Sequence, residues 1–378
     1  MLDPTMKVRR SASPHDGVAS HPPRSIRAIA VSAPECITGS KARKALNSPD
    51  PVSLFNACRC AANSALQGYG AWGESNWANT DNLRKHFLLM YSLDDISVLK
   101  KLLQTERPNM VLIGAMTLCI PGAIECAKLI RKIMGRDTLI VLGGRHVNET
   151  IFLNDENQRL DSAVTHHPAS PGRLMREGAI PPLFDIIISG EAELLVQEIG
   201  ALFAQPSQQP TLHIANYLDR KIAGRWIVDF PALNKTRVSA GIPLKRDQLP
   251  SVVETFGITA SFDVFRGRMT SHVFSDTGPG CVYDCNFCSE RRSVTGNIQE
   301  IKSAGWRLYK QFKETVRTVT QHYPDKLASA FVEDSIFLSG SPAAINQLCL
   351  LLEQDPLDII FGGQFTIDQI INKKEIIR

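Results

Sequence analysis

The sequence has little net charge and no long apolar run. Its 42 basic and 38 acidic residues leave a formal charge of +4 over 378 residues. So small an excess gives no reason to expect nucleic acid or an anionic membrane as a partner. No stretch approaches the roughly 18 to 20 apolar residues of a membrane span, and the first residues lack the apolar core of a secretory signal. We therefore expect a cytoplasmic protein, with a small molecule or another protein open as its substrate.

A disulfide framework is also missing. The nine cysteines are odd in number, and three of them cluster at Cys281, Cys285 and Cys288. This usage favours a reducing, cytosolic setting. The glycines and proline of the preceding turn, residues 276–280, let the backbone bend so that the three thiolates converge. The stretch therefore predicts a metal or cluster site.

This site lacks a fourth protein ligand. A structural zinc site closes with four ligands, and an electron-transfer iron–sulfur cluster normally takes four cysteines. His272 lies before the glycine turn and Cys349 is far along the chain, so neither completes the set. Three cysteines on a 4Fe-4S cluster leave one iron open to a substrate or cofactor. The plainer alternative is a set of buried or incidental cysteines.

From residue 26, short apolar stretches alternate with helical ones. Such stretches are typical of strands covered by helices on both faces. The predicted strands are 27–33, 86–91, 109–114, 138–142 and 185–189, and the predicted helices are 51–65, one capped by Asp94 or Asp95, 121–134 and 192–203. This order predicts an α/β fold with a flavodoxin-like (Rossmann-like) doubly wound sheet over 26–204. A disordered leader (1–25) precedes it, and a connecting region rich in proline (205–270) follows.

Turns rich in glycine and polar residues follow the third, fourth and fifth predicted strands. Ligands of doubly wound sheets bind at this carboxyl edge, and glycine there lets a planar ligand approach the backbone. The candidate ligand-binding residues are Met116, Thr117, Gly143, Gly144, His146, Gly190 and Glu191. Plainer explanations stay open. His146 can hydrogen-bond its own loop, and Thr117 can cap a helix. The negative charge of Glu191 can stabilise the N-terminus of the helix that follows by about 0.3 to 1 kcal/mol.

Strands and helices alternate again after residue 271. The predicted strands are 271–274, 328–332 and 359–361, and the predicted helices are 299–322 and 342–353. The second of these strands ends in Glu333 and Asp334. The third runs into Gln364 and Thr366, which would share one face of a continuing strand.

The cysteine motif, with Phe287 before its last cysteine, resembles the signature of the radical-SAM superfamily. The turns at 143–146 and 190–193, upstream of it, resemble those of the cobalamin-binding domain in cobalamin-dependent members. The resemblance implies a 4Fe-4S cluster, S-adenosylmethionine on the open iron and cobalamin in the first domain. It also implies a partial (βα) radical-SAM barrel over 271–378.

The resemblance assigns roles to several of these residues. Phe287 would pack by the adenine, and Glu333 or Asp334 would hold the ammonium group of S-adenosylmethionine through charged hydrogen bonds. Gln364 and Thr366 would face the barrel mouth. The sequence contains no Asp-x-His-x-x-Gly, so the corrin is expected without a protein imidazole on cobalt.

The implied activity is methylation of an unactivated carbon of a small molecule through a 5′-deoxyadenosyl radical and methylcobalamin. An electron donor such as flavodoxin or ferredoxin would reduce the cluster. Two alternatives stay open: cyclisation or rearrangement with the same cofactors and no methyl transfer, and a catalytically inactive cofactor-binding protein.

The C-terminal region departs from the family's pattern in length. Residues 281–378 give room for about three βα units at roughly 30 residues each, about half of a barrel of that family. An open half-barrel exposes a sheet edge and an apolar face. Two explanations are open: a second chain completes the barrel as a partner, or the chain is a truncated product whose activity is in doubt.

Overall fold

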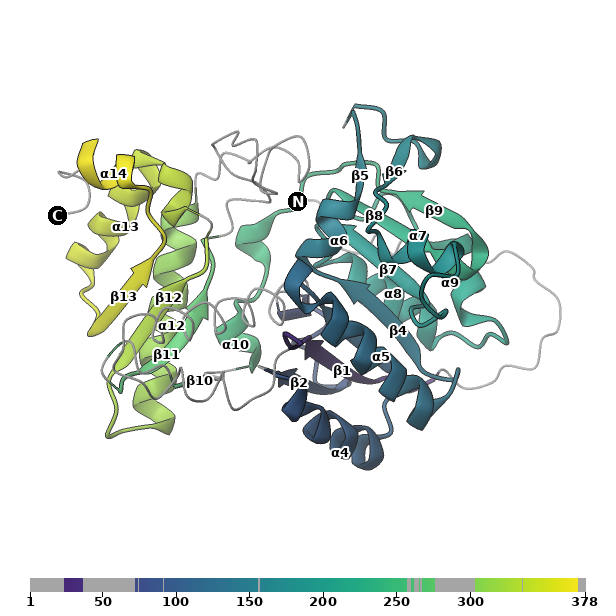
Figure 1. Ribbon diagram of the computed structural model, residues 1–378. Coiled ribbons are helices and arrows are strands. Elements are labelled where there is room, and N and C mark those ends of the chain that lie inside the picture. Colours follow the sequence, from purple (N-terminus) through teal and green to yellow (C-terminus); the bar gives the residue numbers. More distant parts are fainter. Residues whose placement is uncertain are drawn as a thin grey trace, which may run out of the picture.

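The computed structural model describes residues 24–36, 72–73, 75–90, 92–155, 157–256, 260–261, 265, 267–275, 303–334 and 336–372. Residues 1–23 of the predicted leader, the predicted helix 51–65 and the cysteine motif 281–288 lie outside these residues. Within them, two separate sheets follow one another along the chain (Figure 1).

The first sheet has seven strands. In spatial order they are β2 (Arg84–Leu89), β1 (Arg27–Ser32), β3 (Met110–Gly114), β4 (Leu139–Gly143), β7 (Ile186–Gly190), β8 (Trp226–Phe230) and β9 (Lys235–Val238). The first five are parallel, in the order 2-1-3-4-5 of flavodoxin-like sheets. The five predicted strands, the α/β class and a mostly parallel Rossmann-like sheet are thereby confirmed.

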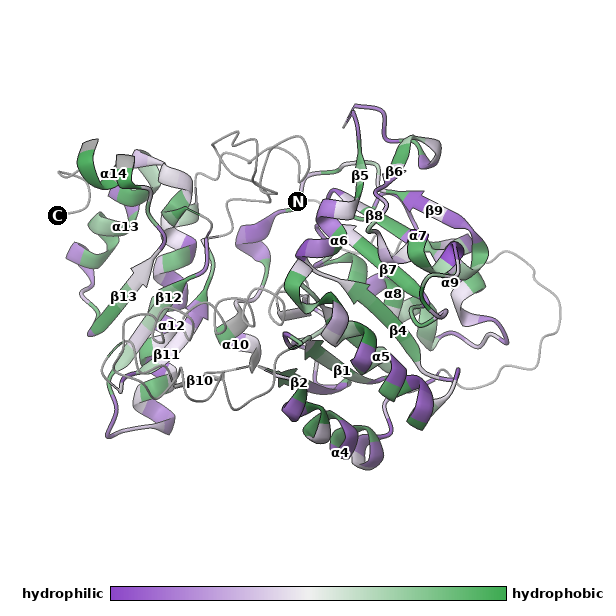
Figure 2. Ribbon diagram, viewed as in Figure 1, coloured by the Kyte–Doolittle hydropathy of each residue, from purple (hydrophilic) through white to green (hydrophobic). Residues whose placement is uncertain are grey.

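Both faces of this sheet are apolar and covered by helices. Ile140 and Leu142 of β4 belong to the cluster beneath α4 (Ile96–Glu106) and α5 (Ile120–Met134). Leu139 and Val141, which alternate with them, belong to the cluster beneath α8 (Leu195–Ala204) and α9 (Pro210–Tyr217). The strands accordingly appear as hydrophobic bands through the centre of this half (Figure 2).

Strands β8 and β9 lie within the stretch that the sequence predicted as a connecting region, 205–270. They extend the first sheet as an antiparallel hairpin, and all five residues of β8 are buried. Pro210 and Pro231, which suggested a linker, instead begin α9 and the 3₁₀ turn Pro231–Leu233 between the two strands. Proline is tolerated at the first position of a helix because the N–H it lacks would have no partner there.

The stretch 148–184, whose polar residues, prolines and glycine indicate loops in the sequence, contains further elements, the first of which begins just before it. They are α6 (Arg145–Thr150), the antiparallel pair β5 (Ile151–Leu153) and β6 (Val164–His166), the 3₁₀ turn Asp161–Ala163 and α7 (Pro171–Arg176). This layer is fixed to the sheet by Asp229 of β8, which is fully buried. Nη1 of Arg176 lies 2.9 and 3.0 Å from its two carboxylate oxygens, and Nε2 of His166 lies 3.4 Å away. His166 thus lies beside the buried ion pair of Arg176 and Asp229.

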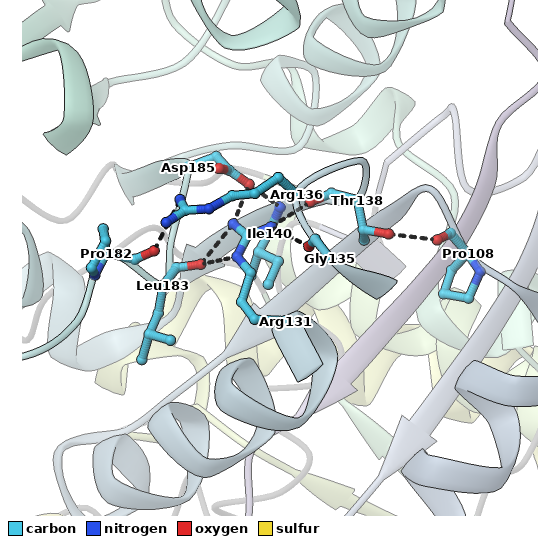
Figure 3. Close-up of polar contacts among 9 residues, drawn as sticks. All are labelled: Pro108, Arg131, Gly135, Arg136, Thr138, Ile140, Pro182, Leu183 and Asp185. Atoms are coloured by element: carbon cyan, nitrogen blue, oxygen red, sulfur yellow. Dashed lines mark hydrogen bonds and ion pairs between the residues drawn. The ribbon is translucent and has the colours of Figure 1, made fainter. Parts of the chain in front are cut away.

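The amino edge of the parallel strands is closed by Arg131 of α5 (Figure 3). Its guanidinium donates to the carbonyl oxygens of Thr138 and Leu183, at 2.7 and 2.8 Å, and to Asp185, at 2.6 Å. The same Asp185 oxygen accepts from the backbone N–H of Ile140 at 2.7 Å. Ligand binding is therefore to be sought at the opposite, carboxyl edge.

The second sheet contains three parallel strands, β11 (Met269–Val273), β12 (Ala328–Val332) and β13 (Ile359–Gly363), with β10 (Ala260–Ser261) antiparallel to β11. Its helices are α10 (Val252–Phe256), α12 (Ala304–His322), α13 (Pro342–Gln354) and α14 (Ile367–Asn372), and its 3₁₀ turn is Phe337–Gly340. The three predicted strands and two predicted helices of this half are confirmed. No helix among the described residues is long and apolar enough to cross a membrane.

The two halves have separate hydrophobic clusters. The last residue of the first half's clusters is Val238, and the cluster of the second half begins at Val253. The short 3₁₀ turn Arg246–Gln248 and the Leu249-Pro250 step lie between them. The boundary between the two cores therefore falls within 239–252.

Candidate active site at the carboxyl ends of β11 and β12

The second sheet has one apolar face and one polar face. Val273 and Val332 point to the helices and belong to the cluster with Leu308 and Phe312 of α12. Because strand residues alternate between faces, their neighbours in sequence lie on the opposite face. The opposite face carries every second residue of β11 and of the stretch from β12 to Glu333: Thr270, His272, Ser329, Phe331 and Glu333.

Two buried polar pairs link β11 to β12 on this face. The hydroxyl oxygens of Thr270 and Ser329 lie 2.8 Å apart, and Nδ1 of His272 lies 2.5 Å from Oε1 of Glu333. All four side chains belong to residues exposed by 2% or less. Four polar side chains on one buried sheet face mark it as different from an ordinary core.

Glu333 has one carboxylate oxygen to spare. Its Oε2 is buried and has no hydrogen-bond partner among the described residues. Leaving a buried polar atom without a partner costs about 1 to 3 kcal/mol, and more for a charged group. A ligand that donates a hydrogen bond or carries a positive charge would remove this cost. Of the predicted ammonium ligands, Glu333 therefore fits the role.

Asp334 is occupied by the chain itself. Its Oδ1 accepts from the backbone N–H of Ser275 at 2.9 Å, and its Oδ2 accepts from the Ser275 hydroxyl and from the backbone N–H of Leu338 at 3.0 Å. These bonds tie the end of β11 to the loop after β12. Asp334 thus shapes the strand ends, and the sequence had left the choice between it and Glu333 open.

Gln364 and Thr366 follow the end of β13, which stops at Gly363. Gln364 is exposed, and its carbonyl oxygen accepts from the N–H of Phe337 at 2.8 Å. Thr366 directly precedes α14, where its carbonyl accepts from Ile370 at 3.2 Å. The shared face predicted for the pair assumed a continuing strand, and the strand does not reach them.

Cys281, Cys285, Cys288 and Phe287 lie outside the described residues. Ser275, held by Asp334, is the last described residue before them. Among the part of the chain that the structure describes, no group of three or more His, Cys, Asp or Glu side chains is arranged to hold a metal ion. The candidate site is therefore built from His272 and Glu333, on the strand that leads into the cysteine motif and on its neighbour.

The corrin was expected at the carboxyl edge of the first sheet, where the surrounding backbone itself requires glycine at positions 144 and 190. Gly144 has φ +95°, and a Cβ there would lie 2.5 Å from the backbone nitrogen of Ala115. Gly190 has φ +94°, and a Cβ there would lie 2.1 Å from the carbonyl oxygen of Arg225. Neither approach leaves room for a side chain. Gly143 accepts from the Ala115 N–H at 3.0 Å, which draws the ends of β3 and β4 together.

His146 is buried and bonded through both ring nitrogens. Its Nε2 lies 3.1 Å from the carbonyl oxygen of Ala169, and its Nδ1 lies 3.2 Å from the hydroxyl of Thr117. Burial lowers the pKa of His146 below its ordinary value, against the smaller raising effects of the Ala169 carbonyl and of Glu149. The Ala169 carbonyl only accepts, so Nε2 of His146 carries a hydrogen, whereas the single hydroxyl hydrogen of Thr117 is divided between Nδ1 and the carboxylate of Glu149. The residue joins three segments of its own chain, as the plainer sequence interpretation allowed.

Thr117 and Met116 begin the turn after β3. Thr117 is exposed, and its hydroxyl also lies 3.0 Å from Oε2 of Glu149. Met116 is partly buried against the apolar cluster on the α5 side. The described contacts of Thr117 and Met116 are with Glu149, His146 and the apolar cluster, and they do not form a ligand cavity together with His146.

Glu191 and Glu193 share a buried arginine. Arg246 donates to Oε1 of Glu191 at 2.9 Å and to Oε1 of Glu193 at 3.0 Å, and all three residues are exposed by less than a tenth. Oε2 of Glu191 accepts from the backbone N–H of Arg225 at 2.9 Å. The two carboxylates thus hold, through Arg246, the segment that leads to the second half. The explanation by charge at a helix N-terminus does not include this contact.

No sequence pattern indicated Arg246, which is 55 residues from Glu191 in the chain and follows no motif. His272 was noticed only as a possible fourth cluster ligand. Strand alternation could have indicated it. Thr270 and His272 are two residues apart on β11 and therefore share a face, and Ser329 and Glu333 share the same face of the neighbouring strand.

Comparison of the chain with protein-family models, curated proteins and solved structures returned no match. The strand order of the first sheet is compatible with a corrin at its carboxyl edge. The side chains expected to meet it are nonetheless engaged: His146 with Ala169, and Glu191 with Arg246. Glu333, in contrast, keeps one buried carboxylate oxygen with no hydrogen-bond partner among the described residues.

Proposed function

We propose that this chain is a radical-SAM enzyme, and that it uses cobalamin to methylate an unactivated carbon of a small molecule. One observation carries the proposal: Glu333 presents a buried carboxylate oxygen without a described partner, next to the strand that leads into Cys281, Cys285 and Cys288. A carboxylate in this position suits the ammonium group of S-adenosylmethionine.

The roles of the residues follow from this placement. The three cysteines would hold a 4Fe-4S cluster, which when bound supplies the electron that cleaves S-adenosylmethionine. Glu333 binds and orients the methionine part, while Asp334 holds the strand ends at Ser275. The polar face of the second sheet is buried, which keeps water from the carboxylate of Glu333 and strengthens its attraction for a cation.

The cluster is tested first. Anaerobic reconstitution with iron and sulfide should give the broad visible absorption of an iron–sulfur cluster in the unaltered protein, and Cys285→Ala should abolish it. Cys349→Ala is the matched control, because Cys349 is an exposed free cysteine on α13. Equal absorption in the Cys285→Ala protein would contradict the assignment.

The reaction is tested next. With a strong reductant, the reconstituted protein should release 5′-deoxyadenosine from S-adenosylmethionine, and Glu333→Gln should suppress this release more than Glu353→Gln on the exposed end of α13. A product heavier by one methylene indicates methylation. A product of unchanged composition favours cyclisation or rearrangement, and cofactor binding without cleavage favours an inactive binding protein.

Cobalamin is tested by binding alone. Titration with hydroxocobalamin should change its visible spectrum and reach saturation at one equivalent per chain. His146→Gln should leave the spectrum of the bound corrin unchanged, because both ring nitrogens of His146 are bonded within the chain. Absence of binding would leave a radical-SAM enzyme without cobalamin.

A further βα element is proposed to pair with β13. The described part of the second sheet has no strand beyond β13, whose Ile360 is 46% exposed. The helix that follows exposes Ile367, Ile370 and Ile371 on one side, and α14 is largely hydrophobic (Figure 2). An unpaired strand beside an apolar helix is a template for strand addition. Ile360→Lys should weaken the association of a second chain that completes the barrel, as measured by sedimentation.

A further inference from the structure

A buried hydrogen bond joins β11 and β12 where Glu333 leaves the sheet. Nδ1 of His272 lies 2.5 Å from Oε1 of Glu333, and each residue is 2% exposed. We propose that His272 is a positioning residue, which holds Glu333 so that its other oxygen meets the ammonium group of S-adenosylmethionine. This inference rests on the proposed function and names a residue of the same site.

The backbone alone does not fix the carboxylate. The N–H of Glu333 donates to the carbonyl of Val273 at 2.8 Å, which continues the parallel ladder one residue past β12. The side chain beyond it has three rotatable bonds, and ordering a glutamate side chain costs up to about 2 kcal/mol of entropy. His272 makes the hydrogen bond that selects one rotamer before the ligand arrives. Preorganisation of this kind improves affinity without a new ligand contact.

The hydrogen bond also assigns the two oxygens different tasks. Oε1 is occupied by His272, whereas Oε2 is buried with no partner among the described residues. Asp334, the next residue, is turned to Ser275 and Leu338 and does not compete for His272 in any described contact. A ligand cation at Glu333 therefore meets a single oriented acceptor.

A comparison of two ligands separates positioning from general support of the fold. The probes are S-adenosylmethionine and its deaminated analogue, in which a keto group replaces the α-amino group. Equilibrium dialysis on the reconstituted protein measures both. His272→Leu and Glu333→Gln should each weaken S-adenosylmethionine binding about tenfold or more, from loss of a charged hydrogen bond, and leave the analogue nearly unchanged.

Three further variants sharpen the result. His272→Asn, whose amide nitrogen lies near the position of Nδ1, should retain most of the affinity. The double variant His272→Leu/Glu333→Gln should bind no more weakly than Glu333→Gln alone, because His272 acts through Glu333. His322→Leu, at the exposed end of α12, is the matched control and should change neither affinity. If His272→Leu does not fold, His272→Phe replaces it, since the ring fills the same space.

Equal weakening of both ligands by His272→Leu would show a merely structural role and overturn the inference, as would no change in either. Failure of the proposed function has a different signature. In that case the unaltered protein forms no cluster, or binds S-adenosylmethionine and releases no 5′-deoxyadenosine. If the unaltered protein binds neither ligand, both conclusions are overturned.

Discussion

The two sheets of this protein differ in what their faces bury. The central strand β4 of the first sheet is apolar on both faces, and its alternate residues enter two separate clusters. The second is apolar only toward α12 and α13, and its other face carries the pairs Thr270–Ser329 and His272–Glu333. Burial of polar groups costs free energy that an apolar pair would not cost. The buried polar pairs of the second sheet therefore mark the face at which we propose that a ligand binds.

The largest effect is expected from the first sheet. Trp226→Ala in β8 removes a fully buried side chain from the first sheet and should lower the free energy of unfolding by about 3 to 5 kcal/mol. Trp306→Ala, on α12 beside the second sheet, is the matched control, because Trp306 is 40% exposed. Urea denaturation measures both. Similar decreases in the free energy of unfolding for the two variants would show that Trp226 contributes no more to stability than an exposed residue.

The ionic clasp of the first sheet should rank next. Arg246→Met leaves the buried carboxylates of Glu191 and Glu193 without their shared cation, and breaking a buried pair in this way costs about 3 kcal/mol or more. Adding Glu191→Gln and Glu193→Gln to the same protein should restore part of the loss. Arg317→Met, at an arginine whose side chain is 71% exposed, serves as the control. A stable Arg246→Met protein would contradict the clasp.

The polar face of the second sheet should tolerate apolar replacement. Thr270→Val removes one partner of a buried hydrogen bond and should cost about 1 kcal/mol, while Thr270→Val/Ser329→Ala removes both partners and should cost less. The reverse change in the first sheet, Val141→Thr, buries a hydroxyl in an apolar cluster and should cost about 1 to 3 kcal/mol. If the double variant proves the least stable, the polar face is structural after all.

The smallest effect concerns pH at the edge of the first sheet. Burial lowers the pKa of His146 from its ordinary value of 6.5, so the unfolded chain binds the proton more readily than the folded chain. Stability should therefore be full above about pH 6.5 and fall as the pH drops through that value. His146→Gln should flatten this dependence in urea titrations between about pH 7.5 and pH 5.5. An unchanged slope would indicate that His146 does not titrate differently in the two states.

Much of the fold was accessible from the sequence, because continuous apolar strands bounded by turns leave a strong periodic signal. The segment 226–238 was missed, since Pro206, Pro210 and Pro231 resembled the composition of a linker. In the folded chain two of these prolines begin a helix and a turn. Proline marks the boundary of an element without saying which element follows.

The site was less accessible, because its contacts join residues far apart in the chain. Glu333 was predicted as one of two equivalent acids, and only the contacts of Asp334 with Ser275 and Leu338 separate them. His272 and Glu333 are 61 residues apart, and no local pattern pairs them. The glycines at 144 and 190 were explained by a ligand, whereas the neighbouring backbone requires them.

The position of Arg246 also decides how this polypeptide can be dissected. The last residue of the first half's apolar clusters is Val238, and Leu244 and Leu249 are buried after it. A fragment cut at Val238 would carry Glu191 and Glu193 as two neighbouring buried anions, which repel each other in a medium of low dielectric constant. A fragment extended to Pro250 retains the guanidinium that neutralises them. Charge balance therefore requires that a fragment of the first half include Arg246 as well as the strands of its sheet.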